Sequence, residues 1–548
     1  MNFPHHYAGL AVVVCWAALG QSACGRSDAT ASTPHAVQAP VSPAQSLGLT
    51  VVPHVTLVAV TDWQSVLKPC GCTPDLQKGG IERIGNFVVD LRKQDDSVLV
   101  VHAGSLLADP ESMATPSKKA QFEQRVQAFV QALVPIAPAA VAFSSLDQEI
   151  GGDAVQAAYA AIPWPVLGVG PSSAATKRQL SIVLKTKSGL QVGILAVDPA
   201  MGDDFAVAKT AGDEVDRLRR RGAQVVVALS NLGLRSSRKL ARAVPALDAV
   251  VVGRLEERTE PELDLEQEGN TAIVHATRHG AYVSTLTLAP QSQQNGEWAD
   301  ASAWLPGVAV DLQSRIEALD KRLAGLQQHP TVALQQALPF IEAERADLDK
   351  RRQAAVDAKG KPLPQGRLRA WRTLGLAWTT AVDAQIAAIV KRYDDAVADQ
   401  NIKNAGEIPA VAPGKAGYVG QTVCLGCHTD VAAFAAQDLH RNAWEGLVKT
   451  AKDKDLDCVP CHATGYGQPG GSLLGKMGSL TSVQCESCHG PGSLHVAAHK
   501  VSEDGPIFAH PDLKTCTTCH TEQHSPRFAF EAYRKRLLVP GHGMPGVH

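Results

Sequence analysis

The sequence has no excess of charge of either sign. Its 548 residues include 52 Lys and Arg against 54 Asp and Glu, which gives a formal net charge of −2. A chain so close to neutral offers no basis for a nucleic-acid or polyanion partner. Beyond the N-terminus it also lacks any run of about 18 consecutive apolar residues, so we expect no later membrane span.

Cysteine is scarce, and its placement is uneven. Twelve cysteines in 548 residues are too few for a disulfide scaffold. Eight of the twelve fall between Cys424 and Cys519, as four pairs that each enclose two residues and are each followed by His. This spacing excludes a generic set of disulfides.

Length and composition predict several folded domains. At about 150 residues per domain, a chain of this length has three or four. Apolar residues make up 45% of the sequence and charged residues 19%, so most of it can fold.

The N-terminus resembles an export signal. The apolar run Ala8–Leu19 has the length of a signal-peptide core. Cys24 follows small residues, as in a lipoprotein cleavage box, which predicts a signal over residues 1–23 and a lipid on Cys24. Simple cleavage after residues 29–31 is the alternative. We therefore expect the periplasm or the outer membrane, with anchoring through the lipidated N-terminus.

Residues 24–50 are rich in Ala, Ser, Thr and Pro and predict a flexible tether.

From about residue 51 to residue 300, short β-branched runs alternate with helical patterns, which predicts an α/β domain whose sheet is covered on both faces. The expected strands are Val55–Val60, Ser97–Val101, Gln191–Val197, Gln224–Leu229, Ala249–Val252 and Thr271–Val274.

Residues 308–403 predict a helical region. Apolar residues from Leu312 to Leu326 recur at steps of three and four, and a second helical stretch covers Val332–Val356, so we expect an antiparallel hairpin packed within the chain rather than a dimer interface. A further helix is expected over Trp371–Ala398. A linker over Asn404–Gly420 leads into a last domain, residues 415–548.

The four cysteine pairs form the pattern C-x-x-C-H, which attaches c-type haem. Two thiols add to the vinyl groups of one haem, and the adjacent imidazole reaches the iron. Zinc knuckles and redox disulfides are the alternatives, but neither needs a His after every second Cys. The sequence therefore predicts four haems c, attached at Cys424, Cys427, Cys458, Cys461, Cys485, Cys488, Cys516 and Cys519, with proximal His428, His462, His489 and His520.

Further histidines in this region can supply the remaining axial positions. Two imidazoles per iron leave no open site and favour electron transfer over ligand chemistry. The candidates outside the motifs are His440, His495, His499, His510, His524, His542 and His548.

Beyond the motifs, residues 424–520 resemble the tetrahaem cytochrome c-554 family. The similar segments are Asp457–His462 with Gly465–Gly471, Leu480–Val483 leading into Cys485–Gly492, and Phe434–Leu447. The resemblance implies a mostly helical multihaem cytochrome domain that carries electrons.

The resemblance also implies ligand roles. His440 would serve the haem of His489. His495, with His499 as its rival, would serve the haem of His520. His542, with His524 as its rival, would serve the haem of His428. The haem of His462 would be five-coordinate.

Residues from about 53 to 290 resemble the 5′-nucleotidase branch of the metallophosphatases, which implies an α/β sandwich. The similar segments are Thr61-Asp62, Gly79–Arg83, Val100–Gly104, Val251–Gly253 and a closing strand near Ala276–Leu288. Where that family binds two metals, this sequence has Asp62–Gln64, Gly104-Ser105, Ser144–Asp147, Asn231 and Gly253–Glu256, of which Asp62 alone is a plausible ligand. A site that holds two metals needs several such ligands. We therefore expect a non-catalytic domain.

Cys70 and Cys72 form a candidate redox or metal pair at the rim of this domain.

Together these features predict an exported multihaem cytochrome that exchanges electrons with redox proteins, rather than an enzyme. One alternative is an oxidoreductase that acts on a small nitrogen or sulfur species at a five-coordinate haem. A second is a metal-dependent phosphoesterase. The sequence does not indicate the oligomeric state.

Overall fold

The structure is a computed structural model. It describes residues 41–69, 78–108, 116–169, 178–254, 266–291, 296–328, 332–498, 507, 510–521, 524–525, 528–540 and 542–544. The predicted signal, Cys24, Cys70, Cys72, His499 and His548 lie outside these residues. No helix of the described residues is long and apolar enough to cross a membrane.

The first sheet has seven strands in the order β12-β13-β11-β1-β2-β3-β4. Strands β1 to β4 run parallel, whereas β11 is antiparallel to both β1 and β13. The bounds are β1 Val55–Thr61, β2 Val98–Ala103, β3 Ala140–Ala142, β4 Val166–Leu167, β11 Tyr282–Ala289, β12 Trp298–Asp300 and β13 Arg367–Gly375.

The second sheet has six strands in the order β5-β6-β7-β8-β10-β9. Its central strands β6, β7, β8 and β10 are parallel, and the two edge strands are antiparallel to their neighbours. The bounds are β5 Ser181–Lys185, β6 Gln191–Val197, β7 Val225–Ser230, β8 Ala249–Val252, β9 Glu266–Glu268 and β10 Thr271–Val274. All six strands predicted from the sequence are confirmed.

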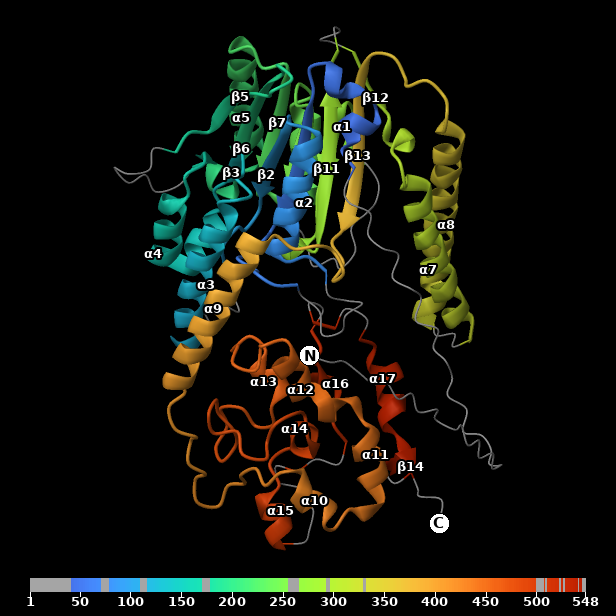
Figure 1. Cartoon of the computed structure of the whole chain (residues 1–548). Helices are drawn as coiled ribbons and strands as arrows, with labels where there is room; N and C mark the ends of the chain where they lie inside the picture. The colour runs from blue at the N-terminus through green and yellow to red at the C-terminus, as the bar shows by residue number, and fades with distance from the viewer. Residues whose placement is uncertain are drawn as a thin grey trace, which may run out of the picture. The chain divides into compact units, whose positions relative to one another are not determined.

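The two sheets pack face to face between two layers of helices (Figure 1). Alternate residues of each strand point to opposite faces, so Leu57 lies between the sheets while Val58 faces the outer helices. The first sheet is covered by α2 Ile81–Gln94, α3 Pro116–Leu133, α4 Ser145–Ala161 and α9 Ala384–Lys403, and the second by α5 Asp204–Arg220 and α6 Gly233–Ala243. The predicted α/β sandwich is confirmed.

Helices α7, Val308–Gln328, and α8, Val332–Ala358, form the predicted hairpin (Figure 1). Leu312, Ile316 and Leu319 of α7 pack against Ile341 and Leu348 of α8. The periodic apolar residues are therefore used for packing within the chain.

The structure corrects the prediction of a helix that begins at Trp371. Residues Arg367–Gly375 form β13, which inserts between β12 and β11 of the first sheet. Leu368 packs in one core and Trp371 in another, on opposite faces of the strand, as a period of two requires. The helix begins later, at Ala384 of α9, where the Asp383 carboxylate accepts a hydrogen bond from the Ile386 amide, 2.9 Å. Residues 308–403 are therefore not purely helical.

The end of the predicted tether is also ordered. Residues Pro43–Ser46 form the short helix α1, and Ala44, Leu47 and Leu49 are buried against the first sheet's edge.

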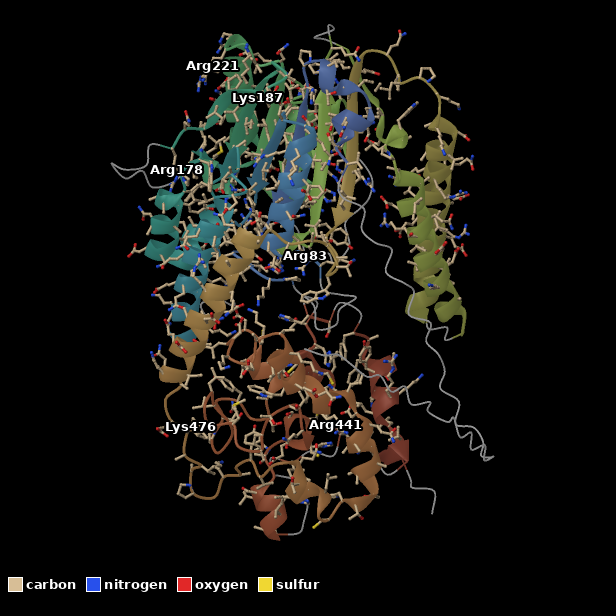
Figure 2. The ribbon with its side chains drawn as sticks, in the orientation of Figure 1. Arg83, Arg178, Lys187, Arg221, Arg441 and Lys476 are labelled. Carbon is tan, nitrogen blue, oxygen red and sulfur yellow. The ribbon has the colours of Figure 1, made fainter. Side chains whose placement is uncertain are left out.

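Arg83 of α2, labelled in Figure 2, lies over the ring of Trp378, 4.8 Å from its centroid. This contact joins α2 to the segment that follows β13.

The C-terminal region consists of short helices joined by loops. Their bounds are α10 Gln421–Leu425, α11 Ala432–Gln437, α12 Ala443–Lys449, α13 Val459–His462, α14 Cys485–His489, α15 Ser493–Ala498, α16 Leu513–Thr517 and α17 Phe530–Leu537, with the two-residue strands β14 Val539–Pro540 and β15 Gly543–Met544. The apolar cluster of this region is small, with Leu447, Leu456, Val459, Ala463 and Leu474 buried.

A buried ion pair holds the start of β1. His54 Nε2 lies 3.0 Å from Asp95 Oδ1, and both side chains are at most 2% exposed. Burial lowers the pKa of His54, but the hydrogen bonds to Asp95 and to the carbonyl of Val52, together with the nearby carboxylate charges, outweigh burial, so the net pKa is raised. Burial raises the pKa of Asp95, but hydrogen bonds from His54, Thr56 and Ser97 lower it overall.

We expect Asp95→Asn to destabilise the α/β region by about 2 kcal/mol at pH 6, because a charged acceptor of buried donors is lost. The raised His54 pKa stabilises the fold below its ordinary value of 6.5, and this contribution is lost as the pH rises through the folded value. The lowered pKa of Asp95 gives a second stabilising contribution, which is present above pH 3.8 and is lost as the pH falls through the folded value. The difference between wild type and variant should therefore shrink at high pH.

Urea unfolding followed by circular dichroism at pH 6 and pH 9 measures this difference. The matched control is Asp213→Asn, in the exposed ion pair with Lys209 on α5, which should not move the midpoint. Equal midpoints for Asp95→Asn and wild type at pH 6 would show that the pair does not stabilise the fold.

Candidate functional site

Each C-x-x-C-H motif forms one tight turn. The amide of His428 donates to the carbonyl of Cys424, 2.9 Å, and the amide of His520 donates to that of Cys516, 2.9 Å. The second motif lies at α13, and the third forms α14. Residues three and four apart lie on one face of such a turn. The two sulfurs and the imidazole of each motif are thereby placed on the same side.

All four motifs line one cavity of about 2510 Å³, and every one of the eight motif cysteines borders it. Pockets for drug-sized ligands have volumes of about 300–1,000 Å³, so this cavity has room for more than one large group. The apolar cluster beside it is small. The donor set of thiols and imidazoles, together with this volume, fits haem c.

Three pairs of imidazoles face each other across this cavity. The ring centroids are 6.1 Å apart for His428 and His495, 6.0 Å for His440 and His520, and 6.1 Å for His489 and His542. A metal ion held between two such rings would need a spacing of about this size, because each metal–nitrogen bond is about 2.0 Å long. Each pair joins one motif histidine to one histidine from outside the motifs.

The predicted histidines are the ones brought together, but the pairing differs from the expectation. The structure places His440 opposite His520 instead of His489, His495 opposite His428 instead of His520, and His542 opposite His489 instead of His428. Among the described residues His524 and His510 belong to none of the three ring pairs.

The buried carboxylate of Glu486 explains the position of His495. It accepts hydrogen bonds from the amides of Val419, Gly420 and Gly492, at 2.7 to 3.1 Å. The segment before the first motif is thus joined to the start of α15, which carries His495. Sequence reasoning had no signal for this contact, because Glu486 is one of the two variable residues inside the third motif.

Hydrogen bonds at Nδ1 orient several of the rings. His462 Nδ1 donates to the carbonyl of Ala443 and His542 Nδ1 to that of Leu537, each at 2.7 Å. His440 Nδ1 donates to the Asp438 carboxylate, 3.1 Å. A carbonyl or carboxylate oxygen only accepts, so Nδ1 carries the proton and Nε2 keeps the lone pair that binds a metal.

His462 differs from the other three motif histidines. Among the residues that the structure describes, no second imidazole stands across from it at the spacing of the three pairs. Its ring is nevertheless held by Ala443 and borders the same cavity.

Residues 423–490 match the family model described as "Cytochrome c554 and c-prime". The matched segment lies in the C-terminal region and includes the first three of the four motifs. The chain is similar to cytochrome c-554 of Nitrosomonas europaea, with 36% identity over 114 residues. This match covers 18% of the chain and 48% of that protein, so the chain spans about half the length of the relative. The family implies haem c.

The chain is also similar, at low identity, to solved structures. The 5′-nucleotidase precursor of Thermus thermophilus is 15% identical with a TM-score of 0.40, and the match covers 68% of this chain and 63% of that one. Sulfate thiohydrolase SoxB of Thermus thermophilus is 11% identical, also with a TM-score of 0.40, and the match covers 70% of this chain and 68% of that one. Sequence identities and TM-scores this low carry no conclusion about activity.

The residues at the strand ends of this region bind the chain's own backbone. Asp62 Oδ1 accepts hydrogen bonds from the amides of Ser105, 3.0 Å, and Arg254, 2.9 Å. Asn231 Oδ1 accepts from the amide of Gly104, 2.7 Å. Asp147 accepts from the amides of residues 106, 107 and 108 at 2.9 to 3.0 Å. Within the described residues, no group of three or more His, Cys, Asp or Glu side chains could hold a metal ion.

Backbone also closes over Asp62. A Cβ added to Gly104 would lie 2.1 Å from Asp62 Oδ1, and one added to Gly253 would lie 2.1 Å from the Gly104 nitrogen. Two glycines are therefore required for this close approach. The space beside the one carboxylate that resembles a metal ligand is occupied by main chain.

The pairing of His542 with His489 predicts the effect of removing a distal ring. With haem c attached at the motifs, His542→Ala should change one iron from low spin to high spin and leave the haem content unchanged. His495→Ala should do the same at another iron, and the double variant should convert two. Electron paramagnetic resonance of the oxidised protein counts these signals.

The matched control is His524→Ala, because His524 is the rival late histidine and its Nδ1 is hydrogen-bonded to Thr521 Oγ1, 3.0 Å. The control should keep the wild-type spectrum. Loss of a low-spin signal in His524→Ala and not in His542→Ala would refute the pairing.

Proposed function

We propose that the protein is an exported tetrahaem c-type cytochrome that transfers electrons between redox proteins. The observation that carries this proposal is the set of three facing imidazole pairs around a cavity bordered by all eight motif cysteines. Haem c, when bound, supplies a one-electron iron couple. The chain attaches the haems through its motif cysteines, orients them through its histidines and encloses them in the cavity.

The ligand sets support electron transfer over ligand chemistry at three positions. We propose the axial pairs His428 with His495, His520 with His440, and His489 with His542. Both axial positions are then occupied by imidazole. The four motifs lie within 97 residues, Cys424 to His520, and border one cavity, so the proposed haems lie close enough to pass electrons among themselves.

The α/β region is proposed to be non-catalytic. Asp62, Asn231 and Asp147 are occupied by backbone amides, and main chain fills the space beside Asp62. A phosphoesterase that uses two metals has no ligand set among the described residues. We propose that this region serves as a docking module for a redox partner.

The proposed domains are a signal over residues 1–23, a tether from Cys24 that ends near Ser42, an α/β region that continues through β13 and α9, the hairpin of α7 and α8 inserted within it, and the cytochrome region from about residue 415. The proposed site of action is the periplasm or outer membrane, with lipidation at Cys24. A role for Cys70 and Cys72 in redox or metal chemistry stays a prediction.

A second candidate function rests on His462. If no histidine outside the described residues completes its coordination, the iron there has an open position. An oxidoreductase acting on a small nitrogen or sulfur species would use it. The reduced protein would then bind carbon monoxide at one haem of four.

We expect pyridine haemochrome analysis of protein from a host with cytochrome maturation to give four haems per chain. The oxidised protein should show three low-spin irons and one high-spin iron. The variant Cys458→Ala/Cys461→Ala should lose one haem and the high-spin signal together. A yield of one haem or none in the wild type would overturn the proposed function, whereas four low-spin irons would refute the second candidate alone.

A further inference from the structure

One face of α3 is directed at the segment that precedes the second haem-attachment motif. Lys118, Gln121 and Arg125 are spaced three and four apart, so they share a side of the helix. They contact Asp455 and Asp457, which lie more than 300 positions farther along the chain.

The contacts are short, and the central ones are buried. Gln121 Nε2 donates to Asp455 Oδ1, 2.6 Å, and Gln121 Oε1 accepts from the amide of Leu456, 3.0 Å. Gln121 is 1% exposed. Arg125 Nη1 donates to Asp457 Oδ2, 2.6 Å, and Lys118 Nζ lies 3.8 Å from the other oxygen of Asp457.

Helix α9 adds a second contact to the same network. The side-chain amide of Asn401, 3% exposed, donates to Gln121 Oε1, 2.7 Å, and to the carbonyl of Lys454, 2.9 Å. Lys452 Nζ bonds Asp455 Oδ2, 2.7 Å, and lies 3.3 Å from Asp394 of α9. A buried network of this kind is costly to break in part, because each lost partner leaves a desolvated group.

This network is joined directly to the haem-attachment turn. The backbone carbonyl of Asp455 accepts from the amides of Cys458, 3.0 Å, and Val459, 2.9 Å, and so begins the turn that carries Cys458, Cys461 and His462. Arg125 and Asp457 border the same cavity as these three residues. A shift of Asp455 would therefore move the attachment site itself.

We propose that the face of α3 formed by Lys118, Gln121 and Arg125 positions the second haem-attachment motif and sets the reduction potential of the iron at His462. The inference rests on the proposed function, since it needs a haem at Cys458 and Cys461. It makes the α/β region a part of the electron-transfer site. The positive charge of Arg125 offsets the negative charge of Asp457, the residue directly before Cys458 in the sequence.

The sign of the effect follows from charge. A positive charge near a haem favours the state that holds the extra electron, so Arg125→Gln should lower the potential of one haem and leave three unchanged. Asp457→Asn should raise the same potential. The double variant should return it toward the wild-type value, and Arg125→Lys should keep it close to wild type.

A potentiometric titration followed by absorbance and paramagnetic resonance measures these shifts at the high-spin iron. The matched control is Arg242→Gln, because Arg242 of α6 also pairs with a carboxylate, that of Glu268, and does not border the cavity. It should change no potential. Gln121→Leu tests positioning, and should alter the resonance of that one iron while leaving its charge environment intact.

Two outcomes would overturn the inference. One is a wild-type potential at the high-spin iron in both Arg125→Gln and Asp457→Asn. The other is an equal shift of all four haems, which would show that the effect is not local. In either case four haems in the wild type would leave the proposed function standing, whereas a missing haem at the second motif would remove both.

Discussion

The C-terminal region depends on the geometry of its cysteine turns and paired imidazoles, because it has little apolar core to fold around. The buried apolar cluster there consists of Leu447, Leu456, Val459, Ala463 and Leu474, beside a cavity of about 2510 Å³. Protein interiors are close-packed, and their few voids are rarely larger than a water molecule. The proposed haems would fill this volume and replace the side chains of an ordinary core. The short helices α10 to α17 then need only to present thiols and imidazoles at the right places.

The sequence predicted the elements whose signal is local. The buried strands β1, β2, β6, β7, β8 and β10 and the hairpin of α7 and α8 followed from apolar periodicity. The strand β13 was missed, although Leu368 and Trp371 lie on opposite faces of an alternating run bounded by Gly366 and Gly375. The motif histidines and the three distal candidates were predicted from spacing and resemblance, and as haem ligands they stay predictions. The way these rings pair in the structure was not predicted, because it depends on contacts such as those of Glu486 that join segments about 70 residues apart.

At the strand ends of the α/β region, buried polar side chains are bound to backbone amides. Asp62 keeps a carboxylate where the resemblance places a metal ligand, yet the amides of Ser105 and Arg254 satisfy it. A buried carboxylate must be paired or hydrogen-bonded, and backbone amides do this without a metal. The sequence showed which ligands were missing. It could not show that Gly104 and Gly253 allow the main chain to occupy the space.

The α3 network argues against two independent modules joined by a linker. Domain boundaries normally fall where few contacts cross, and the sequence predicted such a linker over residues 404–420. The buried contacts of Gln121 with Asp455 and Leu456 nevertheless cross it. If the regions were separated, water could solvate Gln121 and Arg125 on the surface of α3. The turn at Asp455 would lose the partners that fix it, and this turn begins the second attachment motif. In the proposed arrangement the α/β region supplies the position and charge environment of Cys458 and His462, and this role does not depend on metal ligands at its strand ends.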